Sequence, residues 1–477
     1  MIEEILISAG PRRHRIALVR GGRLVELYLA VNGARLPERI ILGRVTAVRH
    51  DLDAAFIDIG EARGGLLSAR DAAVKRGTPV GRAVQEGQSL LVQVKREAEG
   101  EKGAKLSARL RLAGRAMVLL PQGRDVELSG RITDRAQRDR LLSVAKSVQG
   151  NYGGGLILRS AAVATDDADL KREADGLWRR WQAIQAVAGS ARPPLPLDAG
   201  DDPLKVIFRE HLGPSLRRIR VDDGALAADL NQIRGAWGDN IPAVELHDQN
   251  QPLFREHDLE DQIETALAHQ VALPSGGRII IEHTQALTAI DVDSARHDGA
   301  GDPARLAWES NTQAAREIAR QLRLREIGGR VVIDFIPMQG QGQIAALLKK
   351  LQQWLADDPA QPRLGRMSEM GLVELTRRRR QPALALRLGE VCSLCQGSGL
   401  RPTAPAVADS LLDRILREAD AAKGRALAAR AAPAVVEDLG GADGDIVAGL
   451  ARDRGIRVEL TADSSLALEE FEVTALT

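Results

Sequence analysis

The first hundred residues alternate short runs of β-forming residues with glycine turns. Runs rich in Ile, Leu and Val occupy residues 2–8, 14–20 and 23–30, and Gly21-Gly22 separates the second run from the third. A glycine pair between two such runs is typical of a hairpin, so they predict a small antiparallel meander. Four or five further short strands within residues 40–110, with glycines at the turns, predict a small closed barrel.

Helical and strand patterns mix from residue 111 to residue 270. The region predicts an α+β unit over 111–190, followed by mixed structure. The expected elements are a helix over 131–148, a buried strand over 155–159, a helix that starts at 165–167, a loop or linker over 190–203 and a helix over about 259–271.

Residues 275–390 read as an α/β unit, because apolar strand-like runs alternate with long amphipathic segments. The expected elements are strands over 278–282, 286–293 and 330–336 and helices over 303–325 and 343–355. Past residue 401 the chain becomes rich in alanine and helical. It ends in two strand-like runs over 456–460 and 466–473.

Composition excludes several classes of protein. The 477 residues allow roughly two to four domains. A formal charge of +1 excludes a polycation and disorder caused by excess charge. No apolar run of about 18 residues occurs, so we expect no membrane span. The acidic start, Met-Ile-Glu-Glu, is unlike a signal peptide, and only two cysteines occur, so we expect a cytoplasmic protein.

Two of the expected strands carry carboxylates within apolar runs. Period two places Asp291 and Asp293 on one face of the first strand, and Asp334 lies in the second. A lone buried carboxylate costs several kcal/mol unless something compensates it. If the strands are adjacent, Mg²⁺ is a natural partner, since it takes carboxylates plus substrate phosphate and assists phosphodiester cleavage. The alternative is that the acids cap helices or pair with arginines such as Arg296 or Arg330.

The two cysteines, Cys392 and Cys395, form a Cys-x-x-Cys knuckle followed by Gly397 and Gly399. Two thiolates cannot complete a tetrahedral zinc site. The missing ligands would come from a second copy of the chain or from a histidine elsewhere. A redox role is less consistent with the sequence, because no thioredoxin-like helix start follows. A single pair per chain favours a zinc ion that bridges a homodimer.

Basic residues occur in two places that suit nucleic acid. Lys95, Arg96, Lys102 and Lys105 follow the last strands of the expected barrel, and such a rim with one surface aromatic suits single-stranded nucleic acid. The alternative is a solvated β-domain with ordinary surface lysines. The run Arg377–Arg380 fits either phosphate contact or a solvated helix face.

Taken together, these features resemble the ribonuclease E/G family of bacterial endoribonucleases. The resemblance is carried by residues 273–282, 287–294, 315–325, 327–336 and 370–377 and by the cysteine knuckle, in this order. The length of 477 residues looks like that of the shorter members of the family, so we expect no long disordered tail.

The resemblance implies an α+β multidomain fold. Its parts would be a split RNase H-like subdomain (1–35 and 204–270), an inserted OB-fold RNA-binding barrel (36–110) and a sensor of the RNA 5′ end (111–203), then a DNase I-like α/β catalytic subdomain (271–390), a zinc link (391–400) and a small dimerisation domain (401–477).

The resemblance also implies site residues. Asp291 and Asp334 would bind magnesium, and Asp293 stands where the best-known members have an asparagine. Arg159 and Ser160 would form the 5′-monophosphate pocket, with serine in place of the usual threonine. The residues implied to contact RNA are Phe56, Arg96 and Lys102. Leu66 replaces a second aromatic, which predicts a weaker grip on RNA, and Ser393 replaces the usual proline of the knuckle.

The expected function is that of a magnesium-dependent endoribonuclease for single-stranded, A/U-rich RNA. It would favour 5′-monophosphate ends, leave 3′-hydroxyl and 5′-phosphate products, and act in rRNA processing or mRNA decay. Cys392 and Cys395 of two chains would share one structural zinc ion in a homodimer, or in a higher oligomer. The competing hypotheses are a non-catalytic RNA-binding or assembly factor and, less favoured, a deoxyribonuclease.

Overall fold

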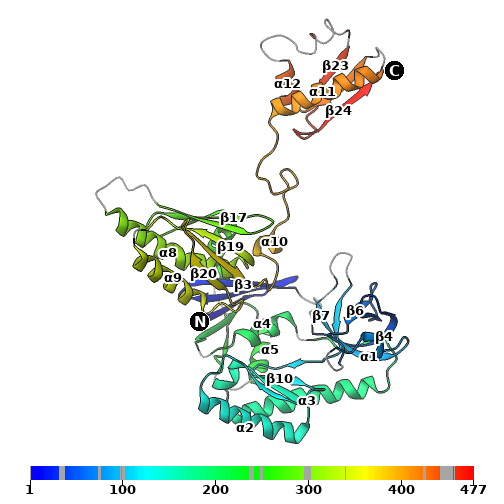
Figure 1. Ribbon diagram of the computed structural model, residues 1–477, viewed down its shortest axis with the longest axis vertical. Coiled ribbons are helices and arrows are strands. Elements are labelled where there is room, and N and C mark those ends of the chain that lie inside the picture. Colours follow the sequence, from blue (N-terminus) through cyan, green and yellow to red (C-terminus); the bar gives the residue numbers. More distant parts are fainter. Residues whose placement is uncertain are drawn as a thin grey trace. The chain divides into compact units, whose positions relative to one another are not determined.

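The computed structural model forms two compact units, Met1–Ala385 and Leu386–Thr477, and each is considered by itself. Figure 1 shows the order of the elements along the chain. The residues that the structure describes are 2–31, 38–73, 77–96, 98, 103–200, 202–213, 215–235, 241–247, 251–294, 302–338, 340–422, 426–440, 449, 455 and 457–476.

The predicted N-terminal meander is confirmed. Strands β1 (Glu4–Ser8), β2 (Arg13–Arg20) and β3 (Arg23–Val31) pair antiparallel, and Gly21 and Gly22 take positive φ values of 56° and 71° at the hairpin. Strand β1 also pairs in parallel with β14 (Arg218–Val221), which in turn pairs with β15 (Val244–Leu246). The resulting sheet, β15-β14-β1-β2-β3, therefore joins two segments more than 200 residues apart. Helices α4 (Pro203–His211) and α5 (Gly224–Gly235) contribute to its core, and α6 (Leu253–Glu256) and α7 (Leu259–Leu267) follow.

The predicted barrel is also confirmed. Its strands are β4 (Ile40–Arg49), β5 (Ala54–Asp58), β6 (Gly65–Ser68), β7 (Ser89–Arg96) and β8 (Lys105–Ser107), with the short helix α1 (Val80–Ala83) before β7. The pairing order β4-β5-β6-β8-β7 closes through β4–β7, with β6 and β8 parallel, which is an OB-like arrangement. Gly43 is required where β4 meets β5, because a Cβ there would lie 2.5 Å from the Ile57 side chain.

The α+β unit that follows has the four-stranded sheet β11-β12-β10-β9 with two helices packed against it. Its elements are β9 (Leu112–Ala113), β10 (Met117–Leu120), β11 (Val126–Leu128), α2 (Arg135–Tyr152), β12 (Gly155–Leu158), the 3₁₀ helix η1 (Ser160–Ala164) and α3 (Asp167–Ala188). Helix α2 begins later than expected because Asp134 caps it, accepting a hydrogen bond from the Gln137 amide. The loop expected over 190–203 is wrong in part. It contains strand β13 (Leu195–Asp198), which pairs with β4 while Leu197 packs into this unit's core.

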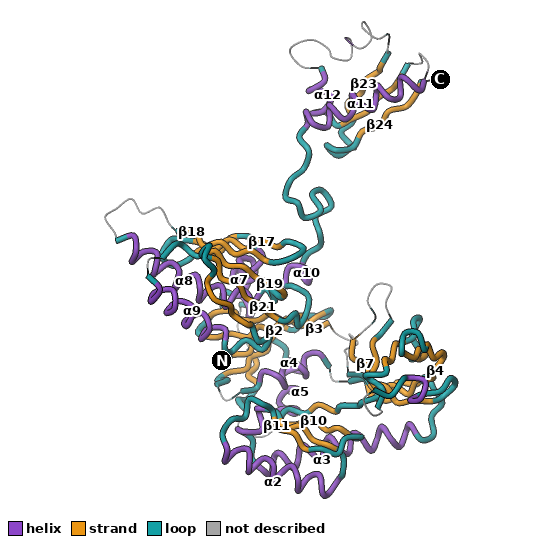
Figure 2. The backbone as a smooth tube through the Cα atoms, viewed as in Figure 1, coloured by secondary structure: helices purple, strands orange, loops and turns teal. Residues whose placement is uncertain are grey.

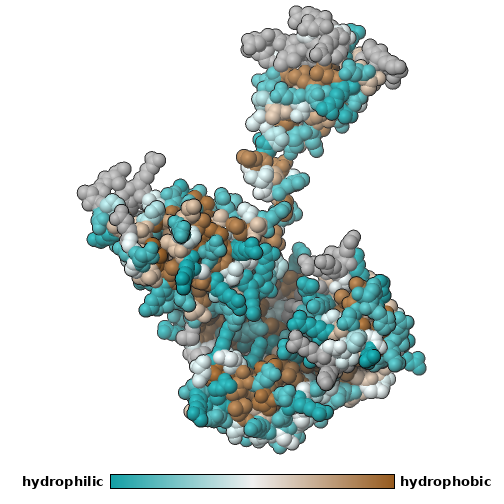
Figure 3. Space-filling model, in the orientation of Figure 1, coloured by the Kyte–Doolittle hydropathy of each residue, from teal (hydrophilic) through white to brown (hydrophobic). Residues whose placement is uncertain are grey.

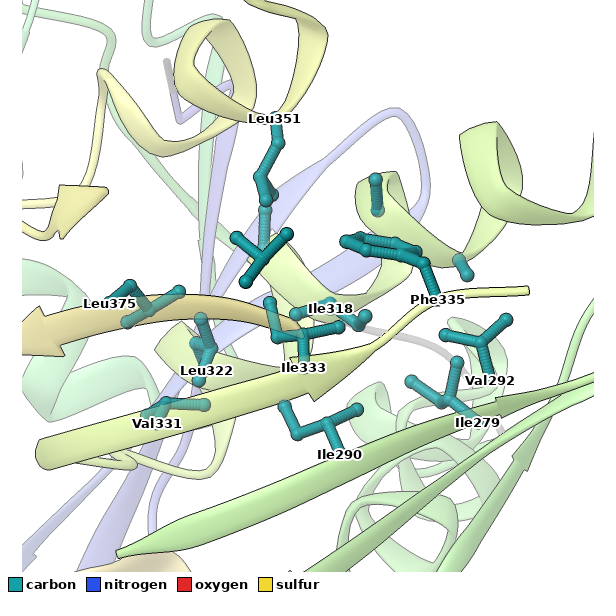
Figure 4. Packing of buried hydrophobic residues seen from close by; sticks show 14 of the residues in the cluster. Ile279, Ile290, Val292, Ile318, Leu322, Val331, Ile333, Phe335, Leu351 and Leu375 are labelled. Atoms are coloured by element: carbon teal, nitrogen blue, oxygen red, sulfur yellow. The ribbon is translucent and has the colours of Figure 1, made fainter. Parts of the chain in front are cut away.

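The six strands β16–β21 form the sheet that carries all three candidate aspartates, called here the aspartate sheet. Its strands are β16 (Gln270–Ala272), β17 (Arg278–His283), β18 (Thr288–Asp293), β19 (Gly329–Asp334), β20 (Arg363–Met367) and β21 (Leu372–Arg377), in the order β16-β17-β18-β19-β21-β20. The helix expected over 259–271 ends at Leu267, because the chain then enters β16 and pairs with β17. Helices α8 (Pro303–Leu324) and α9 (Gln341–Leu355) pack on one face of the sheet, and Figure 4 shows Ile290, Ile333 and Leu322 among the side chains buried there.

The second unit is a small α/β domain after a linking segment. Helix α10 (Leu384–Leu388) crosses the boundary between the units, and α11 (Ala404–Ala422), β22 (Leu427–Ala431), α12 (Pro433–Leu439), β23 (Val458–Ala462) and β24 (Phe471–Ala475) follow. Strand β22 lies between the other two, and both helices contribute to the buried core. The last strand begins five residues later than expected, since residues 463–470 form a turn. Among the described residues, no helix is both long and apolar enough to cross a membrane.

Candidate active site and RNA interface

Asp291 and Asp334 lie directly opposite each other at the ends of two neighbouring parallel strands, β18 and β19. Alternation along each strand directs Ile290, Val292 and Ile333 into the core under α8 and α9, so both carboxylates face the open side of the sheet. The sequence-based expectation that these carboxylates are buried is therefore wrong, because both residues are exposed. The two strands are adjacent, which is the condition under which the sequence favours a shared cation.

The electrostatics of this pair favour a cation. The pKa of Asp291 is raised from its usual value, first by partial burial and then by the negative charges of Asp334 and Asp293. Like charges this close disfavour ionisation of both groups. A positive ion placed between the two carboxylates would relieve that repulsion.

Asp293 is held by a partner that sequence reasoning missed. Arg278 stands opposite it in the β17–β18 hairpin and donates from Nε (3.0 Å) and Nη2 (2.7 Å) to Asp293 Oδ2. Of the arginines proposed as partners from sequence, Arg296 lies outside the described residues, and Arg330 lies opposite Thr376 instead. The register of the hairpin was the signal that could have identified Arg278.

The donor set fits a hard divalent ion. Among the described residues, no group of three or more His, Cys, Asp or Glu side chains is placed to hold a metal. Mg²⁺ needs less than that, since it keeps several waters and is commonly bound by one or two carboxylates plus substrate phosphate. Asp291 and Asp334 supply two carboxylates on an open face with room for both.

The chain after Asp334 is fixed by Asn311, another residue that sequence reasoning missed. Asn311 is fully buried on α8, donates to the Ile336 carbonyl (2.8 Å) and accepts from the Ile336 amide (3.0 Å). These two bonds satisfy a strand end that leaves the sheet. A polar residue among the sheet-facing positions of α8 was the available sequence signal.

The barrel presents one row of side chains across four strands. Phe56 pairs with Leu66, Leu66 with Lys105, and Lys105 with Arg96. Phe56, Lys105 and Arg96 are exposed, and Phe56 keeps 36% of its surface accessible. The row therefore combines one aromatic platform with two cations. Lys102 lies outside the described residues.

Lys95, the other rim lysine, is engaged within the barrel. Its ammonium group lies 2.6 Å from the Asp71 carboxylate, whose pKa is lowered by this hydrogen bond although burial opposes the shift. The Lys105 ammonium lies 3.8 Å from the same carboxylate, so Asp71 pairs with both lysines. Lys95, Lys105 and Arg96 all remain exposed.

Arg159 and Ser160 line a cavity of about 820 Å³, called here the Arg159 cavity. Arg159 donates to the Gly114 carbonyl (3.3 Å), and its guanidinium lies 3.9 Å from the Glu210 carboxylate. Other arginines also line the cavity, namely Arg111, Arg115, Arg131, Arg209, Arg323 and Arg380. Figure 3 shows hydrophobic residues over the sheet that contains strand β10. Val118 of this strand lines the Arg159 cavity. The cavity is large enough for a nucleotide and strongly basic.

The arginine run 377–380 is not a helix face. Arg377 ends β21 with a fully buried side chain, bonded to Asp358 (2.7 Å) and Glu326 (2.9 Å). Arg380 reaches Glu26 and Tyr28, and the pKa of its guanidinium is raised although burial opposes the shift. Both predictions for the run, phosphate contact and a solvated face, are therefore wrong for Arg377, because buried acids surround it.

In the second unit, Cys392 and Cys395 are free thiols in a tight turn. The Gln396 amide donates to the Cys392 carbonyl (2.8 Å), and Gln396 and Gly397 take positive φ values of 48° and 91°. The pKa of Cys395 is lowered by the Gly397 amide first, then by the Gly399 amide and by Cys392. A thiol that ionises readily suits a metal ligand. The Gly397 and Gly399 amides therefore turn toward the sulfur of Cys395.

Comparisons with known proteins identify the family of this chain. The model of the ribonuclease E/G family matches residues 111–380, which contain Arg159, Asp291 and Asp334. Ribonuclease G of Escherichia coli (strain K12) is 30% identical and that of Salmonella typhimurium (strain SL1344) is 29% identical, each over 490 residues and 100% of both chains. Ribonuclease E of Haemophilus influenzae is 35% identical over 410 residues, 83% of this chain and 44% of that one. This chain spans 41% to 60% of the length of four ribonuclease E relatives. It belongs to the ribonuclease E/G family.

Proposed function

We propose that this chain is a magnesium-dependent endoribonuclease acting on single-stranded RNA. The observation that carries the proposal is the opposed pair Asp291 and Asp334 on the open face of the aspartate sheet. A bound Mg²⁺ would neutralise charge that develops on the scissile phosphate. Attack of water on phosphorus, in line with the 3′ oxygen, breaks the P–O3′ bond and leaves 3′-hydroxyl and 5′-phosphate ends.

The surrounding residues support this chemistry. Asp291 and Asp334 would fix the ion, and Asn311 would keep the segment after Asp334 in place. Arg278 would neutralise Asp293, so that the carboxylate resembles the neutral side chain found in the best-known members. Asp293 would then orient the site without adding a full negative charge beside the RNA.

The barrel would grip the strand near the cut. Phe56 offers a ring for stacking, and Arg96 and Lys105 lie in the same row to contact phosphates. Stacking on an aromatic is worth about 1–3 kcal/mol per base. Because Leu66 occupies the second platform position, we expect a looser and more sequence-tolerant grip, and Lys102 would add a further cation.

The Arg159 cavity would receive the 5′ end of the RNA. Arg159 and Ser160 provide a cation and a hydroxyl for a terminal monophosphate. Glu210, 3.9 Å from Arg159, would disfavour the additional charges of a triphosphate. This supports a preference for 5′-monophosphorylated substrates, and A/U-rich strands would be cut best because they stay unpaired.

The assembly and the subdomains belong to the same proposal. Cys392 and Cys395 supply two of the four ligands that structural zinc requires, and a second copy would supply the other two. Exposed apolar residues flank the knuckle and would be covered in such a homodimer: Leu386, Val391, Leu394 and Leu400. The separate cores of the first unit support the RNase H-like, OB-fold, sensor and DNase I-like assignments. The cellular role would be rRNA processing or mRNA decay in the cytoplasm.

The test uses a 5′-monophosphorylated A/U-rich RNA strand with and without Mg²⁺. Wild type should cut internally only with the metal, and Asp334→Asn should abolish cutting. Glu374→Gln is the matched control, because it removes an exposed carboxylate from the neighbouring strand β21 and should leave cutting intact. Binding without cutting under every divalent metal would favour the RNA-binding alternative. Faster cutting of a matched DNA strand would favour a deoxyribonuclease.

A further inference from the structure

A pocket of arginines lies where helix α8 meets the β2–β3 hairpin. Figure 2 shows α8 and α9 side by side along one face of the aspartate sheet. The pocket is formed by Arg20 and Arg23 of the hairpin, by Arg316, Glu317 and Arg320 of α8, and by Trp354 of α9. We call it the arginine pocket. Because α8 covers the buried face of the sheet, the pocket is separated from Asp291 and Asp334.

Glu317 organises the pocket. Its side chain is only 5% exposed and accepts hydrogen bonds from Arg320 (2.9 Å) and from Gln321 (2.8 Å). Its other oxygen lies 2.9 Å from the Arg23 guanidinium. Arg320 also donates to the Leu24 carbonyl (2.8 Å), which fixes it to strand β3. Glu317 thus holds two arginines side by side and is fully used in doing so.

Positive charge remains in excess. Arg20 pairs with Asp357 at 3.4 Å in a contact where both side chains are more than 40% exposed. Arg316 is exposed and makes no hydrogen bond or ion pair with any residue that the structure describes. Four arginines therefore meet two carboxylates. Two further lining residues, Arg323 and Asp358, are engaged with Glu26 and Arg377.

The excess of positive charge in the arginine pocket changes the pKa of Arg23. The pKa of its guanidinium is lowered, first by burial and then by repulsion from Arg320 and Arg316, while Glu317 counteracts the shift. The cavity is about 50 Å³. Since a water needs about 10–15 Å³, this admits a few waters or one tetrahedral oxyanion but not a nucleoside.

We propose that the arginine pocket binds a phosphate group of the RNA backbone, at a second contact remote from the cleavage site. The proposal rests on the proposed function only in that the chain binds RNA. The phosphate held there is not the one that is cut, because α8 lies between the pocket and the carboxylates. RNA long enough to reach from the aspartate sheet around α8 would gain affinity, and a short strand would not. A free phosphate ion offers the same chemistry and is the alternative source.

The first experiment measures RNA binding without divalent metal, so that it does not depend on cleavage. Arg316→Gln is compared with wild type and with the control Arg305→Gln. Arg305 is an exposed arginine on the same helix, paired only loosely with Glu309 (3.6 Å) and about 16 Å away along the axis. Two 5′-hydroxyl strands are used, one of about 8 nucleotides, which a single barrel covers, and one several times longer.

We expect Arg316→Gln to bind the long strand about three- to tenfold more weakly, as for one lost hydrogen bond of ordinary net strength in an exposed position. The slope of log affinity against log salt should become shallower by about 0.7, the value for one phosphate contact on a single strand. The short strand should bind equally well in all three proteins. Equal losses in Arg316→Gln and Arg305→Gln, or no loss in either, would overturn the proposal.

A second experiment distinguishes the two sources of phosphate. Arg159→Gln reduces phosphate binding in the other cavity, and melting is then followed with inorganic phosphate at constant ionic strength. A phosphate-dependent rise in Tm that Arg316→Gln removes, without any effect on long RNA, would assign a small-ion site and refute RNA binding there. An effect on long RNA with no rise in Tm supports the backbone contact. If the long-RNA effect persists in a protein that never cleaves, the pocket stands although the nuclease proposal fails.

Discussion

Replacing Arg377 by Gln should destabilise the first unit strongly. The guanidinium of Arg377 is fully buried and bonds to Asp358 through Nε (2.7 Å) and to Glu326 through Nη1 (2.9 Å). Both carboxylates are themselves at most 5% exposed. The substitution leaves the buried charge of Asp358 without its arginine and leaves Glu326 with only the more distant Arg380, 3.7 Å away. Breaking one buried pair in this way typically costs 3–5 kcal/mol. For a unit of 385 residues, that is a fall in Tm of about 4–6 °C.

The assay is thermal and urea unfolding, with Arg378→Gln as the control. Arg378 is the next residue in the run and is exposed, so its replacement should cost less than about 0.5 kcal/mol. Unpaired buried carboxylates have raised pKa values, and their protonation relieves the cost. The deficit of Arg377→Gln should therefore shrink as the pH is lowered from 7 toward 5. A variant within 1 kcal/mol of the control, or a deficit that does not change with pH, would refute the reasoning.

Three further outcomes are expected. In the proposed zinc-bridged homodimer, Cys392→Ser should give a monomer without zinc, as measured by sedimentation and metal analysis. A dimer that persists in this variant would contradict the proposed bridging role. The pKa of His211 is lowered in the folded protein, chiefly by burial. The contribution of neutral His211 to stability is therefore present above the pKa of the unfolded chain, near 6.5, and is lost as the pH falls below that value. His211→Gln should make the decline in Tm between pH 7.5 and 5.5 less steep. Arg278→Gln removes the half-exposed ion pair with Asp293, which is worth about 0.2–1 kcal/mol. The Mg²⁺ concentration for half-maximal RNA cleavage should therefore change less than about fivefold. Adding Asp293→Asn to the Arg278→Gln protein should restore the wild-type concentration.

Local patterns predicted much of this fold, because hairpins and short barrels are built from neighbouring segments. The glycine pair at Gly21 and Gly22 marked a real hairpin, and the period-two runs of Asp291 and Asp334 marked two real strands. The pairing of β1 with β14 joins distant segments, and the pattern of hydrophobic and polar residues gives no sign of it. The resemblance implied the split, but no pattern in the residues did.

The sequence predicted which residue types make up the candidate site, but it did not predict how buried these residues are or which residues contact them. Exposure of the two carboxylates depends on which face α8 and α9 cover, and sequence alternation alone does not decide this. The burial of Arg377 depends on Glu326 and Asp358, which lie on other segments. The row from Phe56 to Arg96 includes Lys105 only because β6 and β8 are parallel neighbours. No local sequence pattern predicts that pairing.

The split sheet also has a consequence for synthesis on the ribosome. Ile5 of β1 pairs with Ile219 of β14, which is synthesised more than 200 residues later. At a translation rate of 5–20 residues per second, strand β1 is therefore without its parallel neighbour for about 10–40 s. All five barrel strands are translated within that interval, so the inserted barrel can close before the sheet that surrounds it. During this delay the nascent chain carries a bare apolar strand edge, Ile5-Leu6-Ile7, which is a surface prone to misassociation and a natural point for chaperone attachment.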